Sequence, residues 1–255
     1  SICQHCFRNF SPTNYNQRNL MSRKVAILQS NYIPWKGYFD LMDQVDDFVI
    51  YDVVQYTKRD WRNRNKIITP QGLLWLSVPV IVESRDQRID ATKIHDKNWV
   101  NKHLVSIKHN YGKAPYFDVY FDELRDCYQN AGNLEFLSEV NLVFLKWICA
   151  KLNIKTRLHS SREFELSTDK NERLAYICQQ LNADVYLSGP AAKDYLDESC
   201  FADKNIAVEW MDYHGYPEYP QLFGEFEHSV TVLDALFNLG ENAKSSVLRR
   251  YFGES

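Results

Sequence analysis

The chain lacks several features that would assign it to a common protein class. Its six cysteines among 255 residues are too few for a disulfide-rich scaffold. No apolar run approaches the roughly 18–20 residues that a membrane-spanning helix needs. The first residues also lack the charged-then-apolar pattern of a signal peptide. We therefore expect a cytoplasmic protein that has no membrane partner.

Charge of one sign does not dominate the sequence either. Thirty basic and 33 acidic residues leave a formal net charge of −3, so the molecule as a whole has no bias toward polyanions. No known nucleic-acid-binding motif is present, and both observations argue against a nucleic acid as partner. Any attraction to phosphate must therefore be local.

Metal-ligand spacing is missing as well. His95, His103 and His109 are separated by eight and six residues, whereas paired histidine ligands usually stand about three to five residues apart. The CxxC pair of Cys3 and Cys6 has no second pair to complete a zinc site. We expect no bound metal, and no GxSxG or Cys/His signature marks a nucleophile.

The order of apolar patterns predicts an α/β fold. Runs typical of buried strands occur at residues 24–30, 48–54, 156–159, 184–189 and 206–211, and amphipathic helical spacing separates most of them. We predict a three-layer sandwich with a mainly parallel sheet, Rossmann-like or nucleotidylyl-transferase-like, with a β-hairpin and a helical subdomain. Residues 21–255 would form one α/β domain with a helical insertion at about 95–152, and residues 1–20 a disordered or peripheral arm.

A basic stretch follows the second predicted strand. Five of the nine residues from 58 to 66 are basic, and one carboxylate opposes them. A solvated charged loop is the simpler account, but α/β proteins bind ligands where their strands end. Arginine forks suit phosphate or carboxylate, and a nearby aromatic ring can stack on a base or a sugar. The predicted ligand-binding residues of this stretch are Gln55, Tyr56, Lys58, Arg59, Trp61, Arg62, Asn63 and Arg64.

The turn after the first predicted strand is a second candidate site. It lacks the GxGxxG and GxxxxGK[ST] patterns of dinucleotide-binding and P-loop folds. The helix start that follows it could still attract an anion, whereas Pro34 and Gly37 could equally serve only to shape the turn. The polar residues of this turn are Gln29, Ser30, Asn31, Tyr32 and Lys36.

Two further strand ends carry candidate binding or catalytic residues. Asp52 follows the second strand, where it either pairs with the arginines or accepts a proton from a substrate amine. Ser188 and Gly189 end a later strand and Lys193 follows one turn on, so this segment either holds a carboxylate or phosphate or forms an ordinary turn. Ser229 precedes the last apolar helix and is interpreted as its N-cap.

Three of these segments together resemble the WbqC-like protein family. They are Leu28-Gln-Ser-Asn-Tyr-Ile-Pro-Trp-Lys-Gly-Tyr-Phe39, Tyr51-Asp-Val-Val-Gln-Tyr-Thr-Lys-Arg-Asp-Trp-Arg-Asn-Arg-Asn65 and Leu187-Ser-Gly-Pro-Ala-Ala-Lys-Asp-Tyr-Leu196. The resemblance covers about residues 23 to 240. It implies a place in bacterial O-antigen and related polysaccharide biosynthesis, with glycine transfer to the amino group of a nucleotide-linked amino sugar.

A weaker similarity concerns the mechanism. A first strand with a polar turn, and a second strand ending in Val53-Val-Gln-Tyr56, is similar to the layout of pantothenate synthetase and related nucleotidylyl transferases. Those enzymes join a carboxylate to an amine through an acyl-adenylate. Their HxGH motif is missing here, because residues 32–38 contain no histidine. The acyl group would then arrive already activated, and ATP stays open as a cosubstrate.

The residues and the resemblance together predict an amide-forming enzyme that takes a nucleotide-linked amino sugar and a small acyl donor. In this hypothesis the basic side chains hold the diphosphate, and Trp61 or Tyr56 stacks on the base or sugar. Asp52 accepts a proton from the attacking ammonium, and Gln29 or Asn31 stabilises the oxyanion. The alternatives are a non-catalytic nucleotide-sugar-binding module and an ATP-dependent ligase. The sequence leaves open whether the chain forms homo-oligomers.

Overall fold

The computed structural model describes residues 22–253, so the arm predicted at residues 1–20 and its CxxC pair lie outside the described residues. The strands are β1 (Lys24–Leu28), β2 (Asp47–Ile50), β3 (Arg64–Thr69), β4 (Gly72–Ser77), β5 (Val80–Ile81), β6 (Lys93–Ile94), β7 (Arg157–Ser160), β8 (Val185–Ser188) and β9 (Ala207–Trp210). The α-helices are α1 (Lys36–Asp43), α2 (Asn98–Tyr111), α3 (Phe117–Ala131), α4 (Leu137–Lys151), α5 (Arg173–Gln180), α6 (Ser199–Ala202), α7 (Leu233–Leu239) and α8 (Lys244–Val247). Short 3-10 turns are η1 (Ile89–Ala91), η2 (Ser161–Glu163), η3 (Pro190–Asp194), η4 (Gly240–Ala243) and η5 (Arg249–Tyr251). Within residues 22–253, none of the helices has both the length and the apolar character needed to cross a bilayer.

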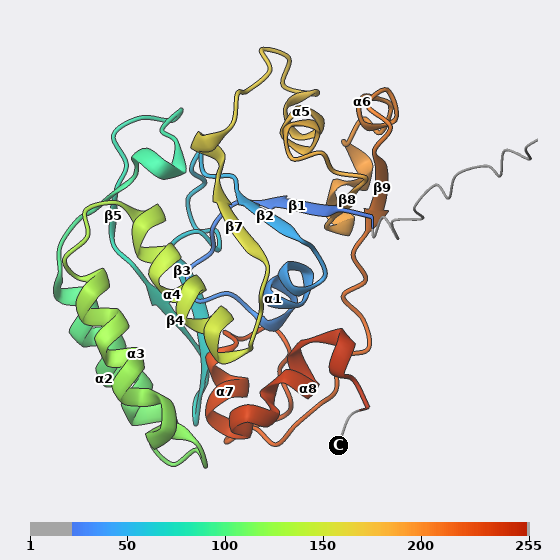
Figure 1. Cartoon of the computed structure of the whole chain (residues 1–255). Coiled ribbons are helices and arrows are strands. Elements are labelled where there is room, and N and C mark those ends of the chain that lie inside the picture. Colours follow the sequence, from blue (N-terminus) through green and yellow to red (C-terminus); the bar gives the residue numbers. More distant parts are fainter. Residues whose placement is uncertain (1–21, 254–255) are drawn as a thin grey trace, which may run out of the picture.

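A five-stranded sheet forms the centre of the fold (Figure 1). Its strand order is β7-β2-β1-β8-β9, and every neighbouring pair is parallel. Counted among themselves, the five strands follow the order 3-2-1-4-5 of doubly wound α/β sheets. The predicted α/β fold with a mainly parallel sheet is therefore confirmed.

Helices cover both faces of this sheet because its side chains alternate in direction. Val25 and Ile27 of β1 point into a cluster with residues of α5 and α6, whereas Ala26 points into the larger cluster with residues of α1, α4 and α7. Strands with two buried faces read as continuous apolar runs, which explains why the sequence pattern predicted them.

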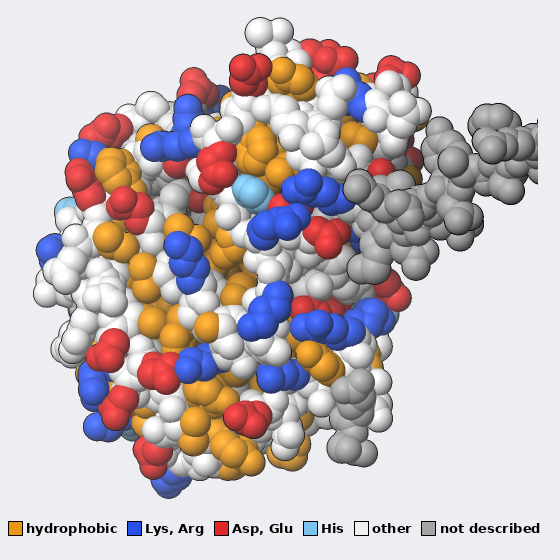
Figure 2. All heavy atoms as spheres, in the orientation of Figure 1, with side chains coloured by type: hydrophobic (Ala, Val, Ile, Leu, Met, Phe, Trp, Pro, Cys, Tyr) orange, Lys and Arg blue, Asp and Glu red, His pale blue; other side chains and the backbone are white. Residues whose placement is uncertain are grey.

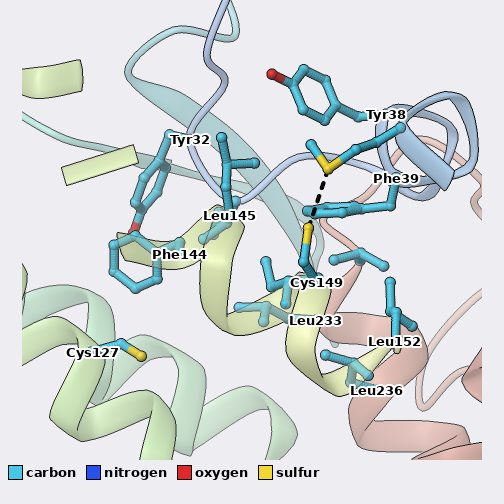
Figure 3. Close-up of a cluster of buried hydrophobic side chains, with 14 of the residues drawn as sticks. Tyr32, Tyr38, Phe39, Cys127, Phe144, Leu145, Cys149, Leu152, Leu233 and Leu236 are labelled. Atoms are coloured by element: carbon cyan, nitrogen blue, oxygen red, sulfur yellow. Dashed lines mark hydrogen bonds between the residues drawn. The ribbon is translucent and has the colours of Figure 1, made fainter. Parts of the chain in front are cut away.

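Helix α4 is the main support of the larger cluster (Figure 3). Apolar residues recur along it at intervals of three and four, so one broad face is buried. In Figure 3 Cys149 points toward the segment around Phe39, whereas Phe144 lies beside Tyr32, with the two ring centres 5.6 Å apart. The thiol of Cys149 lies 3.1 Å from Sδ of Met42. The further residues of this cluster that Figure 3 labels are Tyr38, Cys127, Leu145, Leu152, Leu233 and Leu236. Four cysteines of residues 22–253 are buried and unpaired, namely Cys127, Cys149, Cys178 and Cys200.

The predicted hairpin is present as β3 and β4. Its turn needs a glycine because Gly72 has φ of +107°, a value that side-chain-bearing residues rarely adopt. Strand β3 begins at Arg64, inside the basic stretch of residues 58–66. The end of the basic stretch is therefore part of a strand, which fixes the directions of its side chains.

At the amino end of β2, Asp47 is fully buried among three basic side chains. Its carboxylate accepts hydrogen bonds from Arg23 at 2.8 Å, from Arg157 at 2.8 and 3.0 Å, and from His159 at 2.8 Å. Burial alone would raise the pKa of Asp47, but these hydrogen bonds hold it well below its ordinary value. The carboxylate therefore fixes β2 against β7 and against the start of β1.

We predict that Asp47→Asn lowers the free energy of unfolding by about 2–4 kcal/mol at pH 7, because the substitution leaves the basic side chains without their anion. The folded-state pKa is depressed, so this stabilisation is complete above the ordinary aspartate pKa of about 4 and is lost as the pH falls through the folded value. Urea unfolding at pH 7 and pH 3 measures both effects.

The matched control is Glu209→Gln, which removes an exposed ion pair to Lys24 (2.6 Å) and should cost less than about 1 kcal/mol. Equal losses for the two variants would contradict the role given to Asp47.

Candidate functional site

The candidate residues lie at the carboxyl ends of the central strands. The chain leaves β1 toward β2 and β7 on one side, and β8 and β9 lie on the other, so the topological switch falls between β1 and β8. Open α/β sheets bind ligands outside the strand ends at such a point. Asn31 follows β1, Asp52 follows β2, and Ser188 is the last residue of β8. The fold therefore brings these predicted residues to one edge of the sheet.

The carboxylate of Asp52 is almost completely buried, with 3% of the residue exposed. Its Oδ1 accepts from the backbone N–H of Ser30 at 2.8 Å, and its Oδ2 accepts from the hydroxyls of Ser30 and Ser138, both at 2.6 Å. Burial raises the pKa of Asp52, although these hydrogen bonds oppose the rise. The small exposed part of Asp52 faces a cavity between β2, β7 and α4.

Arg62 is the member of the basic stretch that turns inward. Its guanidinium donates to the side-chain oxygen of Asn31, and its other Nη lies 3.7 Å from Asp60. Asn141 of α4 fixes the backbone at this point, since it donates to the carbonyl of Arg62 and to the hydroxyl of Ser30, both at 2.9 Å. The guanidinium therefore lies next to the end of β1 and one hydrogen-bonded layer from Asp52.

Arg64 points elsewhere. Its guanidinium carbon lies 4.0 Å from the centre of the Trp75 ring, and Nη2 donates to the carbonyl of Arg59 at 2.5 Å. Arg59 itself is exposed and adopts φ of +58°. Arg62 and Arg64, both predicted to bind the ligand, therefore do not converge in the structure.

The first part of the basic stretch faces outward. Gln55 donates to the carbonyl of Arg85 at 2.6 Å, Tyr56 is buried, and Lys58 is exposed. These residues line a separate outer pocket with the segment at residues 82–85. Asn63 donates to the carbonyl of Val78 at 2.9 Å and so supports the hairpin.

Trp61 and Trp75 form an exposed aromatic pair beside Arg62. Their ring centres are 5.4 Å apart with planes inclined by 40°. The ammonium of Lys66 lies 5.6 Å from both rings. Trp61 is among the predicted ligand-binding residues. Trp75 is not, because its strand was predicted only as part of a hairpin, and Lys66 was counted only as one charge of the basic stretch.

The turn after β1 separates the predicted residues into two groups. Gln29 and Asn31 are partly exposed at the strand end. Tyr32 is fully buried and its hydroxyl bonds His103 at 2.7 Å and Tyr128 at 2.5 Å. The structure therefore places Tyr32 in the core, where it anchors the turn to α2 and α3.

The predicted residues at the end of β8 make fewer polar contacts than those at the ends of β1 and β2. Ser188 is buried and its hydroxyl donates to the carbonyl of Gly189 at 3.2 Å. Lys193 is exposed on the five-residue turn η3, and its ammonium lies 5.5 Å from the ring of Trp210. Within residues 22–253, no group of three or more His, Cys, Asp or Glu side chains is arranged to hold a metal ion.

Lys36, at the start of α1, is buried without an ion-pair partner within 4 Å among the described residues. Its ammonium lies 2.5 Å from Nδ1 of His228 and 5.0–5.8 Å from three aromatic rings. Burial lowers the pKa of Lys36 to about 8, although carboxylates farther away oppose the fall. Burial and the neighbouring Lys36 also lower the pKa of His228. The aromatic residues are Tyr216, Tyr219 and Phe226.

Ser229 follows His228, the partner of Lys36, and bonds Lys66 beside the aromatic pair of Trp61 and Trp75. Its hydroxyl donates to Glu227 at 2.7 Å and accepts from Lys66 at 3.0 Å. Helix α7 begins only at Leu233, and its N-cap is Val232. The interpretation of Ser229 as the helix cap is therefore wrong, because the chain runs on for three more residues before the helix begins.

We predict that Lys36→Met changes how stability depends on pH. The pKa of Lys36 is about 8 in the folded protein and about 10.4 in an unfolded chain, so the folded state carries the full cost of the buried charge below pH 8. That cost disappears as the pH rises toward 10.4. Between pH 7 and pH 10 the wild type should therefore gain about 2 kcal/mol relative to the variant. Urea unfolding measures this change.

A constant difference between the wild type and Lys36→Met across this pH range would contradict the prediction.

Comparison with known proteins agrees with the motifs at this edge. The model of the WbqC-like protein family matches residues 29–246, which include the turn after β1 and the ends of β2 and β8. The chain is 50% identical over 222 residues to a Mycobacterium tuberculosis (strain ATCC 25618 / H37Rv) protein named "Uncharacterized protein Rv1507c". The match covers 87% of this chain and 96% of that relative. No solved structure matches. The chain belongs to the WbqC-like protein family.

Proposed function

We propose that the protein is an enzyme of polysaccharide biosynthesis that transfers a small acyl group to the amino group of a nucleotide-linked amino sugar. Its products would be an amide and the leaving group of an activated acyl donor. The substrate's diphosphate, its base and its amine each need a different kind of protein group, and the sheet edge offers all three kinds.

The observation that carries the proposal is the inward-turned guanidinium of Arg62. Only 15% of this side chain is exposed, although a free arginine normally extends its charged end into water. Asn31 and the bond from Asn141 hold it at the strand ends. A guanidinium fixed in this position suits bidentate binding of a diphosphate.

The exposed rings of Trp61 and Trp75 suit the nucleoside. Stacking accepts any base, because every base has an aromatic face. Lys66 next to both rings adds a positive charge on the side where phosphates would follow. A nucleotide could therefore lie along the hairpin with its diphosphate toward Arg62.

Asp52 is the proposed proton acceptor. A carboxyl whose pKa burial raises is a better base than an ordinary aspartate. It would remove a proton from the substrate ammonium, and the nitrogen lone pair would then form the C–N bond. The leaving group of the donor departs with its electron pair, and Asn31 or Gln29 would donate to the oxyanion.

We expect Arg62→Ala to raise KM for a nucleotide-linked amino sugar at least about tenfold, with a smaller change in kcat, because charge-assisted hydrogen bonds to the diphosphate are lost. A panel of UDP-, GDP- and dTDP-linked amino sugars, mixed with glycine or glycyl thioester with and without ATP, is assayed by mass increase. Arg59→Ala is the control, since Arg59 is exposed on the outer loop.

An Arg62→Ala variant that binds every sugar nucleotide as tightly as the wild type would contradict the role proposed for Arg62. Binding without any mass increase would instead favour the non-catalytic sugar-nucleotide module.

Trp75→Ala should weaken nucleotide binding by about five- to 100-fold, since stacking on one ring contributes about 1–3 kcal/mol. Calorimetric titration with UDP, GDP and dTDP measures the loss. Leu74→Ala is matched to it, because Leu74 is also exposed and is the neighbouring residue on the same strand. Equal affinities of the two variants would show that the base does not stack there.

A further inference from the structure

A cavity of about 590 Å³ lies beside the site, bounded by the carboxyl ends of β2 and β7 and the amino end of α4. This volume is within the range of about 300–1,000 Å³ found for small-molecule sites. Ile50, Leu142 and Leu158 provide its apolar wall. Its charged lining consists of the carboxylates Asp52, Asp90, Glu139 and Glu163 and the cations Lys146 and Arg162. On the face that Figure 2 shows, apolar side chains gather over the region of β7 and α4, with charged side chains around them.

Most charges at the cavity already have partners within the protein. Asp90 is bonded by Arg88 at 2.6 and 2.9 Å and by Arg162 at 2.7 Å, so its charge is compensated. Glu163 accepts from the backbone of Ser160 at 2.7 Å and lies 3.2 Å from His159. These contacts fix the rim of the cavity, and the carboxylates of Asp90 and Glu163 are occupied by protein groups that a ligand would have to displace.

Asp52 differs from its neighbours. Its partners are two serines, and no Lys, Arg or His nitrogen of residues 22–253 lies within 4 Å of its carboxylate. A carboxylate buried without a cation is costly unless something compensates it. Glu139, on the same wall, is a second carboxylate. Within residues 22–253 its side chain accepts a hydrogen bond only from the N–H of Phe136, at 3.3 Å, and Arg162 lies near enough to interact with it electrostatically. The cavity therefore has an acidic end that a cation would complete.

We propose that this cavity binds the primary ammonium group of a small polar substrate, with its nitrogen on Asp52 and its carbon skeleton against Ile50, Leu142 and Leu158. The proposal rests on the function proposed above, because the bound amine is then the acyl acceptor. Asp52 takes one proton from the ammonium, the freed lone pair forms the bond to the acyl carbon, and the departing group of the activated donor takes its electron pair and the second proton.

The cavity also gives Asp52 and Arg62 separate tasks. Ser30 and Asn141 stand between the carboxylate and the loop that carries Arg62. The amine therefore approaches Asp52 from the cavity, while the diphosphate stays at the switch between β1 and β8. Amine binding and nucleotide binding can then be measured apart.

The experiment compares D-glucosamine with D-glucose, two probes that differ at one amine. Methyl resonances of Ile50, Leu142 and Leu158 are followed in the full protein by NMR titration. We expect glucosamine to shift these signals at a concentration at least about tenfold lower than glucose, because an ammonium–carboxylate hydrogen bond is charge-assisted. Asp52→Asn should remove the preference while the methyl signals of Leu236, which lies on α7 and does not line the cavity, keep their positions.

Leu142→Trp provides a second variant that fills the cavity without touching Asp52, and it should abolish the shifts with both sugars. Equal response to the two sugars, or shifts confined to other methyl groups, would overturn the proposal. Loss of the Leu236 signals in Asp52→Asn would indicate unfolding, and the Leu142→Trp comparison then decides.

The two proposals fail separately. If Arg62→Ala binds nucleotides as tightly as the wild type and glucosamine still shifts the Ile50 signal, the proposed function is contradicted and the amine site is not. If glucosamine does not shift the cavity methyl signals and nucleotide binding still requires Arg62, the amine site alone is contradicted.

Discussion

The hydrogen bonds to the buried carboxylate of Asp52 are the contact on which this sheet edge depends. They join the end of β2 to the turn after β1 through Ser30 and to the start of α4 through Ser138. Asn141 extends the same network to the backbone of Arg62. A loop that would otherwise be solvated is therefore held against the strand ends, and its basic side chain acquires a fixed position. Within residues 22–253, Oδ1 of Asn141 is the member of this network that is buried without a hydrogen-bond partner.

The two carboxylates that flank β2 show how environment divides the roles of one residue type. Asp47 receives three basic side chains, and its pKa is depressed; Asp52 receives hydroxyl and amide donors alone, and its pKa is raised. The first is suited to permanent ionisation and holds the sheet together. The second is suited to exchanging a proton with a ligand. Environments that push two like groups in opposite directions are a common basis of acid–base chemistry in enzymes.

Much of the fold follows from local patterns in the sequence. Apolar runs predicted the five strands of the sheet because strands buried on both faces leave a strong signal. The basic stretch was predicted as a ligand site from its position after a strand. Which of its members turn inward could not be predicted, because the direction of Arg62 depends on α4 and that of Arg64 on Trp75.

The contact between Lys36 and His228 lay beyond the sequence argument for a similar reason. The two residues are 192 positions apart, and neither shows a local spacing that would connect them. Ser229 was misread because a hydroxyl ahead of an apolar segment has the same pattern whether it caps a helix or bonds a distant lysine. Side-chain networks between loops need the tertiary fold before they can be recognised.

A crystal structure with a bound nucleotide-linked amino sugar tests the central claim most directly. The account predicts that the diphosphate lies on the guanidinium of Arg62 and that the amino nitrogen lies within hydrogen-bond reach of Asp52. A sugar nucleotide bound with its diphosphate away from Arg62 and its amine away from Asp52 would contradict it.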